Sequence, residues 1–302
     1  MVADRPALYA RDMGSTIGSA VTRDGVELLT RHWASPTPPW AGGLIVHGLS
    51  EHSGRYEHVG GWLARAGIEV HAYDQRGWGG SGGLRGDIER WEDLTDDLAE
   101  RLAAVRSATP AGIPVVLYGH SMGGLVAMGY VLGGRPLPDL LVLSAPGIDS
   151  THSRGLRLLA SACDWIVPTF RPPTGTYDGG RLSRDPAVGQ AFRVDPLAVH
   201  DPTARFAAAA FTAQRAARER LDRMRAAGEP FPVRTLVIHG TDDPIVPITA
   251  TERCAAFPEV TRVVYPGLRH ELHNEPEGEA IVGDIIAWLR AQAGAAGARL
   301  AS

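Results

Sequence analysis

The chain has 302 residues with 30 basic and 34 acidic side chains, and this near balance of charge gives no electrostatic basis for binding nucleic acid. All the basic side chains are arginine, which excludes chemistry that depends on a lysine amine. No apolar run reaches the roughly 18 residues of a transmembrane helix, and the charged residues 1–13 lack the apolar segment of a signal peptide. We therefore expect a cytoplasmic protein, in which Cys163 and Cys254 are buried apolar side chains without a disulfide.

Short apolar runs alternate with helical patterns through the first half of the chain. Two β-rich runs flank Asp24-Gly25 and predict a hairpin. Further strands are predicted over 43–46, 68–73, 115–118 and 140–144, with an amphipathic helix over 91–105. Because these strands are mostly apolar and are separated by helices, they predict an α/β fold with a mostly parallel sheet that helices cover on both faces.

The composition changes in the middle of the chain. Residues 151–226 contain 12 Arg against six Asp and one Glu, with several prolines and no convincing buried strand. Helical patterns instead begin at Leu156, Val188 and Phe206. They predict a helical cap, for which ordinary helices of the core are the alternative. The predicted division is a core over 1–147 and 231–302 with a cap inserted over 148–230.

Strands and helices alternate again after the predicted cap. The patterns predict strands over 233–238 and 261–265, a helix over 248–257 between them, and a terminal helix over 276–293. Polar turns that contain Asp242, Asp243 and His270 end the two strands.

A serine lies at the apex of a predicted strand–turn–helix, in Gly119-His120-Ser121-Met122-Gly123. The two glycines leave room for a strained turn, which presents the hydroxyl of Ser121 above the sheet as a nucleophile. The N–H of Met122, at the start of the helix, would face a developing oxyanion. A helix N-cap is the structural alternative for Ser121.

A second G-x-S-x-G match is centred on Ser81, but no helix begins there, so we prefer Ser121. The same glycine-rich loop contains Gly77, Gly79 and Gly82 in the spacing of a dinucleotide fingerprint. That fingerprint requires a helix at the glycines, and we interpret them instead as a tight turn that lines the site.

A serine nucleophile needs a base to take its proton and a carboxylate to orient the base. In open α/β sheets such groups gather beyond the carboxyl ends of the strands, and the order Ser121, Asp, His270 is that of the α/β-hydrolases. We prefer Asp243 to Asp242 as the acid, because Asp243 lies further out of its strand. Asp149, which follows an earlier strand, is a remote third candidate.

Three further groups adjoin this predicted centre. His273 lies close to His270 in sequence, but no further ligand accompanies the pair, so neither a metal nor another cofactor is expected. His120 is expected to pack beside Ser121 as support. The loop after the strand at 43–46 should supply a second oxyanion donor, for which the N–H of Leu49 is the candidate.

With these motifs the sequence resembles the monoacylglycerol lipase and lysophospholipase branch of the serine α/β-hydrolases. The resemblance extends over about residues 15–293. It is carried by His47-Gly48 with residues 51–56, by residues 119–124, and by Asp74, Arg76, Gly77, Gly79 and Ser81.

The resemblance implies an α/β-hydrolase fold with a helical cap, and it implies site residues position by position. The implied residues are the triad Ser121, Asp243 and His270, the oxyanion donors Leu49 and Met122, and the glycerol-binding residues Glu51, Arg55 and His273. In the branch, the cap is mobile and touches lipid surfaces.

The function that follows is hydrolysis of a monoacylglycerol to fatty acid and glycerol through an acyl-enzyme, without a cofactor. The alternatives are a general carboxylesterase or lysophospholipase acting on other monoesters and, more remotely, a non-catalytic ligand-binding homologue. A further hypothesis is that the arginine excess of the cap attracts anionic membrane surfaces; solvated helix faces are the alternative. The sequence does not determine the oligomeric state.

Overall fold

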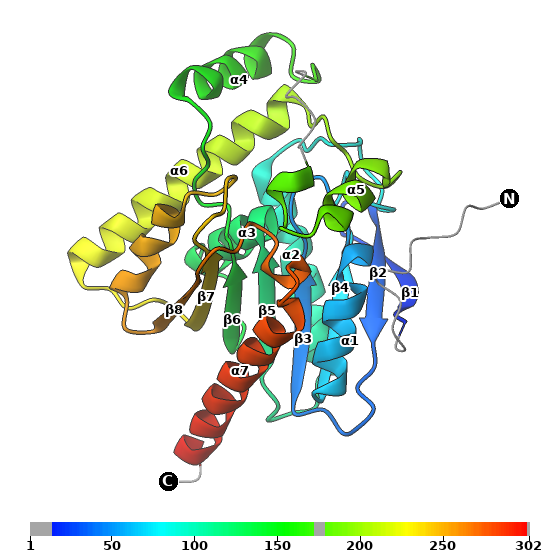
Figure 1. The fold of residues 1–302 in the computed structure, drawn as a ribbon, viewed down its shortest axis with the longest axis vertical. Coiled ribbons are helices and arrows are strands. Elements are labelled where there is room, and N and C mark those ends of the chain that lie inside the picture. The colour runs from blue at the N-terminus through cyan, green and yellow to red at the C-terminus, as the bar shows by residue number, and fades with distance from the viewer. Residues whose placement is uncertain (1–13, 172–178, 301–302) are drawn as a thin grey trace, which may run out of the picture.

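The computed structural model describes residues 14–171 and 179–300, and the predictions for residues 1–13 and for 172–178 of the cap lie outside them. The described chain forms one sheet with the strand order β1-β2-β4-β3-β5-β6-β7-β8 (Figure 1). The strands are β1 (Thr16–Val21), β2 (Glu27–Trp33), β3 (Ala41–Val46), β4 (Ile68–Tyr73), β5 (Val115–His120), β6 (Leu140–Ser144), β7 (Arg234–Gly240) and β8 (Val260–Tyr265). Every predicted strand is therefore present.

The sheet is mixed at one edge and parallel elsewhere. β1 pairs with β2, and β2 with β4, in antiparallel register, and the hairpin predicted at Asp24-Gly25 is confirmed. The pairs from β4 through β3, β5, β6 and β7 to β8 are all parallel. This topology confirms the predicted α/β fold class, and it brings the carboxyl ends of β3, β5, β7 and β8 to the same edge of the sheet.

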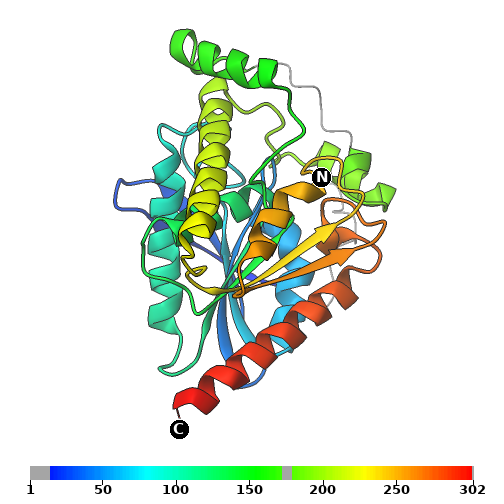
Figure 2. The same cartoon turned by 90° about the vertical axis from the view of Figure 1, so that its left-hand side faces the viewer.

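Helices cover the sheet on both faces, as Figure 2 shows from the side. α1 and α7 pack on one face, while α2, α3 and α6 pack on the other. The helices are α1 (Glu57–Arg65), α2 (Trp91–Ala108), α3 (Ser121–Leu132), α4 (Arg154–Ile166), α5 (Pro186–Val194), α6 (Ala204–Ala227) and α7 (Gly278–Leu300). Short 3₁₀ helices are η1 (Ser53–Tyr56), η2 (Gly179–Arg181), η3 (Ile248–Ala256) and η4 (Leu272–Asn274).

The segment predicted as a helix over 248–257 is the 3₁₀ helix η3. The carbonyl of Ile248 accepts hydrogen bonds from the Thr251 hydroxyl at 3.1 Å and from the Arg262 guanidinium at 3.2 Å. The bond from Arg262 ties the first turn of η3 to β8.

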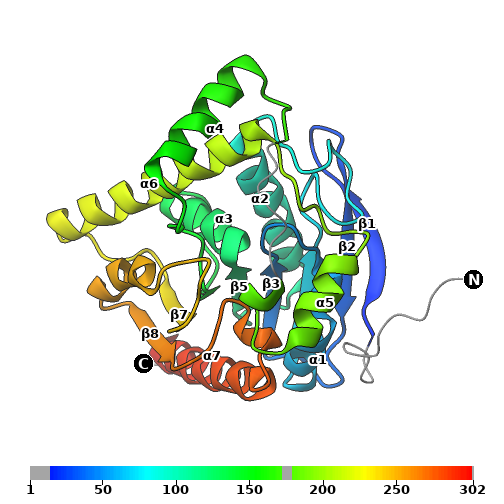
Figure 3. The ribbon, with the colours of Figure 1, turned by 45° about the horizontal axis from the view of Figure 1, so that its top comes forward.

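The described part of 148–230, which we call the cap, is helical and contributes no strand to the sheet. Figure 3 shows α4, α5 and α6 arranged across the carboxyl ends of the parallel strands. The start of α6 is fixed to the core, because the buried Asp87 carboxylate accepts hydrogen bonds from Thr203 at 2.6 Å and from Arg205. α4 lies further out and packs against α6.

Candidate active site

Ser121 lies at the junction of β5 and α3, and its backbone is in the left-handed region with φ 50°. A side chain on either flanking glycine would collide with backbone. A Cβ on Gly123 would lie 2.2 Å from the carbonyl oxygen of Val46, and one on Gly119 would lie 2.6 Å from that of Gly123. The glycines therefore let the strained turn pack tightly against β3, and the turn holds the serine hydroxyl above the sheet.

Three side chains from separate turns meet at this point. The Ser121 hydroxyl is 2.8 Å from Nε2 of His270, which follows β8. Nδ1 of His270 is 2.7 Å from Oδ2 of Asp243, which follows β7. With Nδ1 protonated toward the carboxylate, Nε2 is free to accept the serine proton, so the arrangement provides a nucleophile, a base and an orienting acid.

The surroundings of Asp243 keep it ionised. Its Oδ1 accepts the backbone N–H groups of Ile245 at 2.8 Å and Val246 at 3.0 Å, and its Oδ2 also lies 3.1 Å from His239. Burial alone raises the pKa of the Asp243 carboxyl, but His270 and the hydrogen bonds bring that pKa well below its usual range. Burial lowers the pKa of His270, but Asp243 outweighs burial and leaves that pKa above its ordinary value.

The alternative candidates from the sequence have other hydrogen-bond partners, although Asp149 lines a cavity that also reaches Ser121. Asp242 is exposed, and its carboxylate accepts a hydrogen bond from the Thr241 hydroxyl at 2.8 Å. Asp149 pairs with Arg157 at 2.9 Å. Ser81 is buried in the glycine-rich loop, where it accepts the N–H of Leu29 at 2.9 Å and donates to a backbone carbonyl. No helix begins at the glycines of this loop, so the dinucleotide alternative lacks its structural context.

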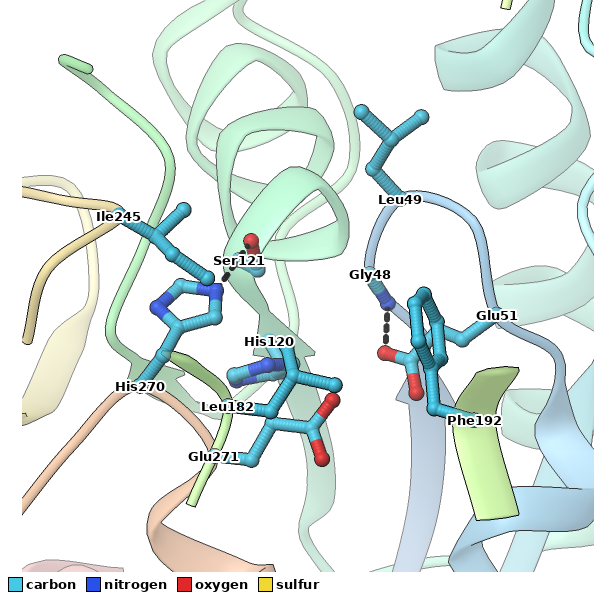
Figure 4. Close-up of a pocket in the computed structure, with 10 residues that line it drawn as sticks. All are labelled: Gly48, Leu49, Glu51, His120, Ser121, Leu182, Phe192, Ile245, His270 and Glu271. Carbon is cyan, nitrogen blue, oxygen red and sulfur yellow. Dashed lines mark hydrogen bonds between the residues drawn. The ribbon is translucent and has the colours of Figure 1, made fainter. Parts of the chain in front are cut away.

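The two predicted oxyanion donors flank Ser121. Met122 is in the first turn of α3, where an N–H has no acceptor within the helix. Leu49 follows β3 and lines the same small cavity as Ser121 and His270. A hydrogen bond within the loop holds the backbone next to Leu49, because the N–H of Gly48 donates to the carboxylate of Glu51 at 2.5 Å. Figure 4 shows this bond and the position of Leu49 above it.

The three residues expected to bind glycerol have different positions. Glu51 lines the small cavity, whereas Arg55 and His273 are buried and do not line it. Arg55 binds Glu51 at 2.8 Å and binds both oxygens of Glu271 at 2.7 Å. The ring of His273 stacks on that of Tyr56 with 4.8 Å between centroids. Direct contact of Arg55 or His273 with a substrate therefore has no support in this geometry.

Glu271 is not among the residues expected from the sequence, although it lines the cavity beside His270. A carboxylate directly after the predicted base was visible, but its partner Arg55 is 216 residues away and no local pattern joins them. His120 is buried beside Ser121, and its ring lies 4.9 Å from that of His270.

Two cavities meet at Ser121. The larger one, of about 410 Å³, is lined mainly by apolar side chains of α3, α4 and α6, among them Leu125, Leu156 and Phe206. The smaller one, of about 30 Å³, lies on the side of Glu51 and Glu271. Leu49, Ser121 and Ile245 line both cavities.

Cys163 is half-buried on the wall of the larger cavity, which corrects the expectation of a fully buried cysteine, because α4 lies on the outside of the cap.

The fold, the serine turn and the hydrogen-bonded Asp–His–Ser arrangement define the class of serine α/β-hydrolases. The model of the family described as serine aminopeptidase S33 matches residues 38–277, and the chain belongs to this family. The resemblance seen in the sequence is confirmed, and the chain is an enzyme of the ester-hydrolysing serine hydrolases.

The similar proteins are mostly lipases and esterases. A monoacylglycerol lipase of Mycolicibacterium smegmatis is 31% identical over 273 residues, which cover 88% of this chain and 93% of the relative. A monoglyceride lipase of Rattus norvegicus is 28% identical and is matched over 92% of each chain. The crystal structure of a monoacylglycerol lipase of Paleococcus ferrophilus has a TM-score of 0.76 at 26% identity, covering 88% of this chain and 99% of that one.

No helix in the described ranges 14–171 and 179–300 is long and apolar enough to cross a membrane.

Proposed function

We propose that the protein hydrolyses monoacylglycerols to a fatty acid and glycerol. The observation that carries this proposal is the apolar cavity of about 410 Å³, which ends at Ser121. Its volume is in the range of pockets that enclose a small ligand, and its lining suits an acyl chain better than a polar group. The names of the relatives support the same substrate.

The proposed roles follow from the positions of the side chains. His270 takes the proton of Ser121 while the serine oxygen attacks the ester carbonyl, and the N–H groups of Leu49 and Met122 stabilise the oxyanion. His270 then protonates the departing glycerol oxygen, which leaves an acyl-enzyme. A water molecule that gives its proton to His270 attacks the acyl-enzyme and releases the fatty acid, and the serine hydroxyl is restored.

A panel of glycerol monoesters tests the acyl part of this proposal. With glyceryl monobutyrate, monolaurate and monooleate below their aggregation limits or in mixed micelles, we expect kcat/KM to rise by about tenfold or more from butyrate to laurate, because each buried methylene adds binding energy. A general carboxylesterase would instead prefer the butyrate. Lysophospholipids and an aminoacyl p-nitroanilide complete the panel. Faster turnover of either would contradict the proposal and favour a lysophospholipase or an aminopeptidase.

We further propose that α4 and the residues after it contact membrane surfaces. Large apolar side chains are exposed there, led by Trp165 at 88% exposure with Leu158 and Ile166 beside it. An exposed apolar patch that carries an indole suits the interface of a bilayer. Such a contact would bring the cap over lipid substrates while the core stays in water.

Substitution of Trp165 by alanine is expected to weaken binding to neutral phosphatidylcholine vesicles by about tenfold, because the insertion of a large apolar side chain is lost. Cosedimentation with vesicles measures this, and Ile17→Ala, which removes an exposed apolar side chain at the far edge strand, is the control. Unchanged binding of Trp165→Ala would contradict the proposal. Binding that requires anionic lipid and disappears in salt would point instead to the arginine excess.

A further inference from the structure

The small cavity beside Ser121 has two carboxylates in its wall. Glu51 and Glu271 are only 2% and 3% exposed, and both line the cavity together with Ser121 and His270. Figure 4 shows the two carboxylates facing one another below Ser121, with Phe192 and Leu182 of the cap closing the space. The two cavities are separate and share Ser121 in their walls, so an ester whose acyl chain occupies the larger cavity would present its alcohol part to the smaller one and to these carboxylates.

A single guanidinium neutralises the two carboxylates only in part. Arg55 bonds to Glu51 at 2.8 Å and to Glu271 at 2.7 Å through two N–H groups. Among the described residues, the two carboxylates also accept hydrogen bonds from the Gly48 N–H, the Tyr56 hydroxyl and the Asn274 amide, all of which are neutral. Arg55 is thus the one cation among the described groups that are bonded to the two carboxylates.

Of the neighbouring imidazoles, His270 is paired with the Asp243 carboxylate, and His47, His120 and His273 do not supply the missing positive charge. Burial lowers the pKa of His120 to about 3, and it lowers the pKa of His47 and holds that of His273 well below its ordinary value. These rings are therefore neutral at physiological pH. Burial alone raises the pKa of the Glu271 carboxyl, but Arg55 brings that pKa well below its usual range, so Glu271 is ionised.

We propose that the buried charge of Glu51, Arg55 and Glu271 selects the alcohol part of the ester, admitting neutral and cationic alcohols and rejecting anionic ones. A charge buried beside the reacting atoms is weakly screened, so an anionic group placed there is repelled at short range. Glu271 is thus a specificity-determining residue. The inference rests on the proposed function in one respect, namely that Ser121 attacks an ester whose acyl chain lies in the apolar cavity.

Three soluble butyrate esters with the same acyl group test this directly. Their alcohol parts are glycerol, choline and glycolate, which are neutral, cationic and anionic. For the unmodified enzyme we expect kcat/KM to be at least about tenfold lower for the glycolate ester than for the glycerol ester, with the choline ester at least equal to the glycerol ester. The preference should persist in about 0.5 M NaCl, because salt screens exposed charges far more than buried ones.

Two variants should move this preference in opposite directions. Glu271→Gln removes one negative charge with little change of shape, and the ratio of the glycerol to the glycolate ester should fall by about tenfold. Arg55→Gln leaves two uncompensated carboxylates, and the ratio should rise. Glu275→Gln is the matched control: this glutamate is equally buried on the same loop but binds Ser183 and Arg184 outside the cavity, so the ratio should not change.

The ratio is insensitive to a general loss of activity, so a variant that folds poorly still reports on selection. Equal rates of the unmodified enzyme on the glycerol and glycolate esters would overturn the proposal, as would an unchanged ratio in Glu271→Gln. Failure of the proposed function has a different signature. In that case the butyrate esters are hydrolysed with the expected order, while long-chain monoacylglycerols are not substrates.

Discussion

Replacement of Ser121 by alanine is expected to lower kcat by about 10⁴-fold or more, because the members of a triad act as a unit and no other hydroxyl is bonded to His270 in the described site. The fold should persist, since alanine fits the same strained turn that serine occupies. The variant should lose both the hydrolysis of glyceryl monolaurate, measured as initial rates, and covalent labelling by a fluorophosphonate probe.

The serine of the second glycine-rich match provides the control. Ser81→Ala removes two buried hydrogen bonds and should lower the melting temperature, but the enzyme should keep its labelling and most of its activity. Full activity of Ser121→Ala would refute the assignment of the nucleophile. Absence of labelling in the unmodified protein would support the remaining non-catalytic alternative, because only an activated serine reacts with the probe.

Replacement of Asp243 by asparagine should lower kcat by about 10³- to 10⁴-fold through a change of tautomer. The N–H groups of Ile245 and Val246 hold one oxygen of this side chain, so an asparagine would keep its oxygen there and turn its amide N–H₂ toward His270. His270 would then accept at Nδ1 and carry its proton on Nε2, where it cannot take the serine proton. Asp242→Asn, on the exposed turn, should retain activity within about twofold.

The pH profile gives this variant a second readout. Asp243 raises the pKa of His270 against the effect of burial, so the unmodified enzyme should lose kcat/KM as the pH falls through a pKa above the ordinary histidine value. Without the charge of Asp243, burial remains and the pKa of His270 falls. The acidic limb of the residual activity should therefore move to lower pH in Asp243→Asn. A limb that stays in place would contradict the role of Asp243.

Local patterns predicted the parts of the molecule that depend on neighbouring residues. The bounds of β4 and β6 agree with their apolar runs, and the strand–turn–helix around Ser121 lies where its glycines indicated. Asp243 was preferred to Asp242 because it lies further from the end of its strand, and in the structure its carboxylate is hydrogen-bonded to His270. These features are encoded within a few residues, so a single sequence contains enough information.

Other features depend on residues that are distant along the chain. Arg55 seemed available for a substrate, yet it is engaged by Glu271, which belongs to a turn at the far end of the sequence. His273 is enclosed by Tyr56 and His120. The first turn of η3 is bonded to the side chain of Arg262 in the following strand. Long-range pairing of this kind leaves no periodicity in the sequence.

The order of the strands has a consequence for biosynthesis. The Leu49 loop follows β3 and Ser121 follows β5, but Asp243 and His270 follow β7 and β8, and His270 lies 149 residues after Ser121. A growing chain that has not yet extended past β8 contains Ser121 without His270, so the serine hydroxyl lacks the group that would take its proton. Because these long-range pairings form slowly compared with local helices, activity arises only with the completed sheet. Ester hydrolysis by this arrangement therefore requires that both ends of the parallel sheet have been made and paired.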